Sequence, residues 1–227
     1  MPILTHLQAP NNTYGSIIFP AGFAGNHLRW LLFLDPRYDV SKSICANTVS
    51  RKLKFIQKNV YPDTRTWYNW LTTEWKYRVA LNDYIEIVHA QFNWENSSNK
   101  ELYLTTKNLD LPFHHYFHLN LGLNAHTPEY FQEMNQAWVN EFEVLELRIH
   151  EFDNKKICDC DPLFSPTLSK EFYTDVINFY GFDDNYDSAQ QVHQWYHACR
   201  VKSVKDFCEY IASNSFKSRI EFLTNSI

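Results

Sequence analysis

The chain has 227 residues, of which 44% are hydrophobic and 17% aromatic, and it carries a formal net charge of -5 at pH 7. This composition is typical of a folded protein, which we expect to be a single domain over residues 1–227, and the negative charge argues against a nucleic acid or a membrane surface as partner. Five cysteines without the spacing of a disulfide framework, and the lack of a leader or a long apolar run, predict a cytoplasmic protein.

The first predicted unit is a strand, a glycine loop and a helix within residues 16–38. A β-branched and aromatic run at 17–19 predicts the strand, and leucines at helical spacing from residue 28 predict the helix. Gly22 and Gly25 in the loop let the backbone approach an anion at a helix N-terminus, where Asn26 and His27 add donors. The alternative is a strand-to-helix turn whose glycines serve close packing.

Helical patterns follow at residues 43–58, 64–81 and 127–149. The second of these carries an aromatic stripe of Trp67, Trp70 and Trp75 at helical spacing. We expect this stripe to pack in the core or to wall a substrate pocket, and the alternative is stacking on nucleic-acid bases.

Three further strands are predicted at residues 84–88, 102–106 and 155–160. His89 follows the first of them, and Lys107 follows the second. Ligands of open α/β sheets gather outside the carboxyl ends of the strands, and histidine is the side chain that ordinarily titrates near neutral pH. His89 is therefore a candidate general base, and the alternative is a loop histidine without a role.

Several polar side chains have spacings that suit ligands. Lys107 and His115, eight positions apart and with His114 beside them, are candidates for holding one phosphate. Three pairs also have a spacing that suits a metal: His114 with His118, Cys158 with Cys160, and His193 with His197. We expect packing rather than metal or redox chemistry at these pairs, and no metal site.

The last part of the chain predicts helices at residues 165–182, 186–199 and 203–212, with Gly181 as the stop of the first. A strand, loop and helix followed by strands separated by helices is the order of a parallel sheet. The expected fold class is α/β, a three-layer sandwich with a short central parallel sheet flanked by helices.

Several stretches, in the family's order, resemble a small sulfotransferase of the P-loop nucleotide-binding-like fold, as a diverged microbial or phage-type member. The loop Gly22-Phe23-Ala24-Gly25-Asn26-His27 looks like the family's 5′-phosphosulfate loop. Residues 86–89 look like the strand that ends in its catalytic histidine, and residues 102–115 are similar to the strand and helix start that hold the 3′-phosphate. Residues 156–182 and 192–196 are softer matches to its late strand and helices.

The resemblance implies transfer of a sulfuryl group from 3′-phosphoadenosine 5′-phosphosulfate to a hydroxyl or amine of a small-molecule or glycan acceptor. The loop would hold the 5′-phosphosulfate, His89 would remove the acceptor proton, and Lys107 with His114 or His115 would bind the 3′-phosphate. Phe23 stands at the family's loop lysine, so His27 is expected to supply the missing charge.

Two alternatives to this enzyme stay open. The first is a catalytically inactive protein of the same fold that binds a partner, which the phenylalanine at position 23 suggests. The second is a kinase-type transferase. It is the weaker alternative because the loop lacks a Walker lysine. The sequence names neither an acceptor nor an oligomeric state.

Overall fold

The computed structural model describes residues 14–20, 22–38, 48–64, 85–89, 100–108, 133, 136, 139, 140, 143 and 155–213. Most of the helical patterns expected at 64–81 and 127–149, and the start of the one expected at 43–58, lie outside the described residues, as do His114, His115 and His118.

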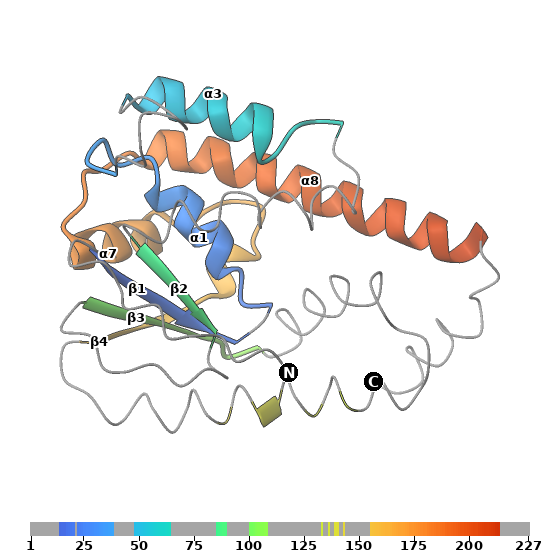
Figure 1. The fold of residues 1–227 in the computed structure, drawn as a ribbon, viewed down its shortest axis with the longest axis horizontal. Helices are drawn as coiled ribbons and strands as arrows, with labels where there is room; N and C mark the ends of the chain where they lie inside the picture. The colour runs from blue at the N-terminus through green and yellow to red at the C-terminus, as the bar shows by residue number, and fades with distance from the viewer. Residues whose placement is uncertain are drawn as a thin grey trace, which may run out of the picture.

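Four strands form one parallel sheet in the order β2-β1-β3-β4. They are β1 (Gly15–Phe19), β2 (Ile85–His89), β3 (Lys100–Thr105) and β4 (Lys155–Asp159), and all three pairings are parallel. The four predicted strands and the parallel α/β class are thus confirmed (Figure 1). The β-branched and aromatic residues that predicted β1 are all buried, as expected for a central strand of a parallel sheet.

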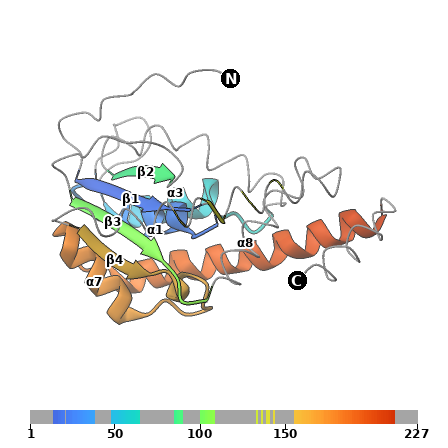
Figure 2. The same cartoon turned by 90° about the horizontal axis from the view of Figure 1, so that it is seen from below.

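Helices cover one face of this sheet. Helix α1 (Gly25–Leu32) lies between the sheet and α8 (Tyr186–Ser213), and α3 (Val49–Asn59) packs on α8 (Figure 1). Helix α7 (Lys170–Tyr180) lies beside β4, and the second half of α8 extends beyond the sheet (Figure 2). A short 3-10 helix (Asp161–Leu163) follows β4.

Alternation along the strands separates the two faces of the sheet. Ile17 and Leu102, which are paired in register, belong to the core shared with α1, α7 and α8. Ile18 and Tyr103, one position further, point to the other face and are also 0% exposed. Of the expected three layers, the described residues show the sheet and one helical layer, and the expectation of a single domain stays a prediction.

The structure corrects two helix boundaries. Helix α7 begins at Lys170 rather than at residue 165, because the Ser169 hydroxyl accepts the Phe172 N–H at 3.2 Å and caps the helix there. Residues 186–213 form one helix and not two, since no Gly or Pro interrupts the chain between them. Gly181 ends α7 in the left-handed region at φ 78°, as predicted.

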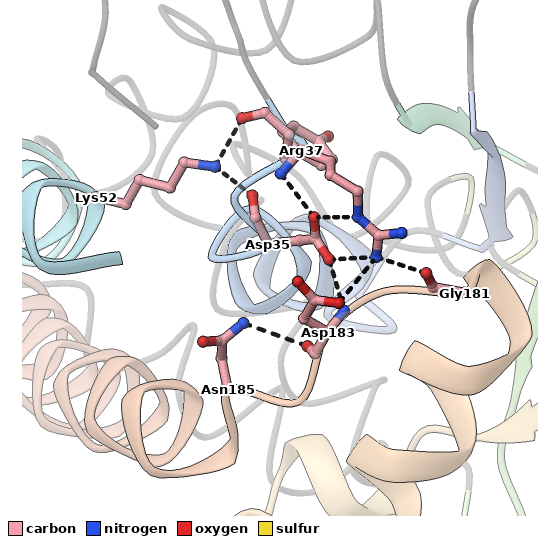
Figure 3. A network of polar contacts seen from close by, with 7 residues as sticks. Asp35, Arg37, Lys52, Gly181, Asp183 and Asn185 are labelled. Carbon is pink, nitrogen blue, oxygen red and sulfur yellow. Dashed lines mark hydrogen bonds and ion pairs between the residues drawn. The ribbon is translucent and has the colours of Figure 1, made fainter. Parts of the chain in front are cut away.

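A polar network around the buried Asp35 carboxylate ties the end of α1 to α3 and α7 (Figure 3). The Asp35 carboxylate accepts from the Arg37 guanidinium at 2.8 and 3.0 Å and from the Asp183 N–H at 2.7 Å, and Arg37 also donates to the Gly181 carbonyl. Lys52, 1% exposed, donates to the carbonyls of Asp35 and Tyr38.

Burial alone would raise the pKa of Asp35, but the hydrogen bonds from Arg37 and Asp183 outweigh it, so the pKa is lowered. The network lies near the amino ends of the strands. Tyr180, at the adjacent end of α7, shows this, since its hydroxyl donates at 2.8 Å to the carbonyl of Ser16, the second residue of β1. Among the described residues, no helix combines the length and the apolar character needed to cross a membrane.

Candidate functional site

The carboxyl ends of the four parallel strands meet at one edge of the sheet. In the order β2-β1-β3-β4, the chain passes from β1 to its neighbour β2 on one side of β1, and it later returns to add β3 on the opposite side of β1. Such a reversal is a topological switch point, and crevices for ligands open at the carboxyl ends of the two strands that flank it. Here those strands are β1, followed by the glycine loop, and β3, followed by Lys107. The structure therefore brings together the two elements that the sequence predicted for phosphate.

The glycine loop turns twice through the left-handed region before α1 begins. Gly22 has φ 95°, and Ala24, the N-cap of α1, has φ 57° and ψ 22°. A left-handed conformation costs a non-glycine residue about 1–2 kcal/mol, so the surrounding fold holds Ala24 there. The N-cap residue, Ala24, makes no side-chain cap hydrogen bond, and no acidic residue lies in the first turn of α1. The partial positive charge of this helix end is thus not offset by the helix's own first turn.

Gly25 is required for packing. A Cβ atom built on Gly25 would lie 2.1 Å from Cε1 of the Phe19 ring, far inside any normal contact. The ring of the last β1 residue thus lies against the backbone at the first residue of α1. Close packing therefore explains the glycine at position 25, and the positive φ explains the glycine at position 22. Both explanations are compatible with an anion at the helix end.

The side chains of the loop divide into buried and accessible ones. Phe23 is 0% exposed and belongs to the core, and Ala24 is 6% exposed. Gly22 and Asn26 are half-buried, so Asn26 is the loop residue whose amide can reach a ligand. At the position of the family's loop lysine, the chain therefore places a core side chain.

His27 points into the protein and not toward the loop. It is 1% exposed, its Nδ1 lies 3.2 Å from the Tyr61 hydroxyl, and its Nε2 lies 3.0 Å from Nδ1 of His193. Arg29 on the same helix is also buried and donates to the Ile85 carbonyl of β2 at 3.4 Å. The role expected for His27 as a substitute cation stays a prediction, and the contacts of both ring nitrogens within the protein weigh against it.

A pair of aspartates lies beside Lys107, and the sequence reasoning missed it. The Thr106 hydroxyl lies 2.5 Å from Oδ1 of Asp161, and the Asp161 N–H donates to Oδ1 of Asp159 at 3.0 Å. Burial raises the pKa of Asp161; the bond to Thr106 opposes this, Asp159 adds to it, and Lys107 opposes it. These carboxylates reduce the attraction of Lys107 for a phosphate. Two aspartates at the carboxyl end of a predicted strand, Asp159 inside it and Asp161 directly after it, were the available signal.

His89 is the last residue of β2, and its backbone pairs in register with Phe19. It therefore stands at the carboxyl edge, across β1 from Lys107, as the sequence predicted; its side chain is not described. His114 and His115 lie outside the described residues, so their expected contacts with the 3′-phosphate stay predictions.

The cysteine pair of β4 shows no sign of reactivity. Cys158 and Cys160 are 5% and 0% exposed, and burial raises the pKa of the Cys158 thiol to about 11 and that of Cys160 further. Within the described part of the chain, no three His, Cys, Asp or Glu side chains are grouped so that they could hold a metal ion.

Comparisons with models of known protein families, with curated proteins and with solved structures found no match to this chain. What the fold and the site define is a class, an α/β protein with a parallel four-stranded sheet and a glycine loop at its switch point.

Proposed function

We propose that this protein binds a phosphorylated nucleotide at the loop of residues 22–27 and uses it as a donor of a sulfuryl group. The observation that carries the proposal is the strand order, which puts Lys107 and the start of α1, whose N-cap Ala24 makes no side-chain cap hydrogen bond, on the two sides of one switch point. The resemblance to sulfotransferases supplies the ligand, 3′-phosphoadenosine 5′-phosphosulfate, and the P-loop-like character of the fold.

The described residues fit this nucleotide in part. The helix end and the Asn26 amide suit the 5′-phosphosulfate, and exposed Lys107 suits the 3′-phosphate. The fit is poorer for the charge that develops on the leaving phosphate, because Phe23 and His27 both point inward.

In the proposed reaction, an acceptor oxygen or nitrogen attacks sulfur, and the bond between sulfur and the bridging oxygen breaks. His89 takes the acceptor proton, and adenosine 3′,5′-bisphosphate leaves with the electron pair of the broken bond. The acceptor is a hydroxyl or amine of a small molecule or a glycan.

A second candidate is a protein that binds the nucleotide or another partner without transferring the group. The specific observation in its favour is the burial of Phe23 at 0% exposure where the family has its lysine. Without a cation on the bridging oxygen, binding can persist while the transition state loses its main electrostatic stabilisation.

Calorimetric titration with adenosine 3′,5′-bisphosphate tests the binding step. Lys107→Ala should weaken binding about fivefold, and Asp161→Asn should strengthen it about fivefold, because a charge contact of about 1 kcal/mol is lost in the first variant and gained in the second. Arg51→Ala, an exposed cation in the first turn of α3 and so at the end of this helix beside the Asp35 network, is the matched control and should change nothing. Absence of heat at millimolar ligand would refute the proposal.

The two candidates are then separated by turnover. Release of adenosine 3′,5′-bisphosphate from the phosphosulfate in the presence of an acceptor panel indicates the enzyme, and His89→Ala should abolish this release while keeping the affinity for the bisphosphate. Binding without release across the panel supports the second candidate. Loss of affinity in His89→Ala would mean that His89 has a structural role or contacts the nucleotide.

A further inference from the structure

Three buried side chains and one backbone carbonyl, from four parts of the chain, form a hydrogen-bonded row behind the glycine loop. Tyr61 lies 3.2 Å from Nδ1 of His27, Nε2 of His27 lies 3.0 Å from Nδ1 of His193, and Nε2 of His193 lies 2.7 Å from the Ser165 carbonyl. Tyr61, His27 and His193 are 0, 1 and 0% exposed. The row links the segment after α3, the first turn of α1, α8 and the segment before α7.

The carbonyl at one end determines every proton in the row. The Ser165 oxygen can only accept, so Nε2 of His193 carries a proton. Nδ1 of neutral His193 must then accept from Nε2 of His27, and Nδ1 of neutral His27 must accept from the Tyr61 hydroxyl. All three donors therefore point the same way, and each ring has a single tautomer.

An added proton would reverse this row. A proton on Nδ1 of His193 would face the Nε2–H of His27. The hydrogen bond between the two rings survives only if the His27 proton moves from its Nε2 to its Nδ1, and the Tyr61 hydroxyl then has to turn away. Among the described residues, the groups around the pair do not favour such a proton. They are Tyr61, the Ser165 carbonyl, the Tyr196 ring stacked on His27 at 3.8 Å, and His197 beside His193, with Arg200 beyond it.

These neighbours are neutral or positively charged, so they offer an added proton no counter-charge. Burial lowers the pKa of His193, although its bond to Ser165 opposes this, and burial with the nearby charges of His193 and Arg200 lowers the pKa of His197 to about 4. His193 thus stays neutral near pH 7.

His27 is the third residue of α1, so the row holds the turn whose N–H groups face the proposed ligand. We propose that His193 is a positioning residue that fixes the first turn of α1 through His27, and that protonation of this row in acid loosens the glycine loop. This inference rests on the proposed function and adds regulation of the same site by pH.

The test compares His193→Asn, His193→Phe and His197→Asn with the wild type. Asn at position 193 can still accept from His27 but cannot titrate, whereas Phe leaves the His27 N–H without its acceptor. His197 lies on the same helix but outside the row, so His197→Asn is the matched control.

Two measurements follow the row across pH 5 to 8. For adenosine 3′,5′-bisphosphate, the affinity of His193→Phe should fall at least about tenfold at neutral pH, and that of His193→Asn should stay within about threefold of the wild type. In acid the wild type should lose affinity relative to His193→Asn. Protonation of the ligand itself affects both proteins equally, so it does not contribute to this difference. His197→Asn should keep the wild-type affinity profile.

Hydrogen exchange of the amides at positions 25–28, without ligand, makes the result independent of the proposed function. His193→Phe should exchange at least about tenfold faster there than His197→Asn. Equal exchange in these two variants, or equal pH profiles in the wild type and His193→Asn, would overturn the inference. If the bisphosphate does not bind the wild type, the proposed function fails and the exchange data alone decide the positioning role.

Discussion

The contact between Phe19 and Gly25 predicts a large destabilisation by one methyl group. In Gly25→Ala the new Cβ would lie 2.1, 2.3 and 2.4 Å from three atoms of the Phe19 ring. To reach an ordinary contact of 3.4 Å, the nearest pair must separate by 1.3 Å (3.4 minus 2.1). The ring is 2% exposed within the core and cannot swing into solvent. Because overpacking of a buried site costs about 1–3 kcal/mol, and three ring atoms clash here, we expect a loss of about 3 kcal/mol.

Urea unfolding, with the midpoint converted at a common slope, measures this loss. Phe19→Leu alone should lower the free energy of unfolding by about 1.5 kcal/mol. In the Phe19→Leu background, Gly25→Ala should cost about 1–2 kcal/mol less than it does in the wild type, and this difference is the coupling energy of the pair. Gly181→Ala is the contrasting control, since no atom lies within 4 Å of its built Cβ and its cost comes only from φ 78°. That cost should be about 1 kcal/mol and should not depend on residue 19. The reasoning is refuted if Gly25→Ala stays within about 0.5 kcal/mol of the wild type, or if the Phe19→Leu background gives no relief.

Two further predictions concern charge and pH. Asp35→Asn should lower the free energy of unfolding by on the order of 2 kcal/mol at neutral pH, because an amide cannot replace both carboxylate oxygens toward Arg37 and Asp183. The folded pKa of Asp35 lies below its ordinary 3.8, so the wild type holds this stability above about pH 4 and loses it as pH falls through the folded pKa. If the urea midpoints of Asp35→Asn fall in acid as steeply as those of the wild type, this prediction is wrong. His197 has a proton linkage of the same sign at higher pH, since its pKa falls from 6.5 to about 4 on folding and the unfolded chain binds more protons between these values. Its stability contribution is complete above pH 6.5 and decreases as pH falls to 4, by about 1–2 kcal/mol once the solvent screening of a half-buried ring is allowed for, so His197→Asn should flatten the stability profile there. A profile as steep as the wild type's would argue against a neutral ring in the folded protein.

Local sequence patterns predicted the site's scaffold better than its chemistry. The positions of Lys107 and His89 at strand ends were predictable, because a strand of five or six residues is recognised from its own apolar run and its neighbour along the chain is then known. The Asp159 and Asp161 pair could have been flagged in the same way. Its contact with Thr106 could not, because β3 and β4 are separated by 49 residues of chain and meet only through sheet pairing.

By itself, the sequence determined the four strands, the α/β class and the glycine loop that joins β1 to α1, because these depend on periodicity and on residues adjacent in the chain. Only the tertiary structure decided the strand order, the contact that makes Gly25 necessary, and the inward direction of His27. The rotation of α1 about its axis is set by packing against α8, and no local pattern in the loop carries that information. The same histidine that suits an anion in the sequence is therefore placed by the fold in a buried row behind the loop.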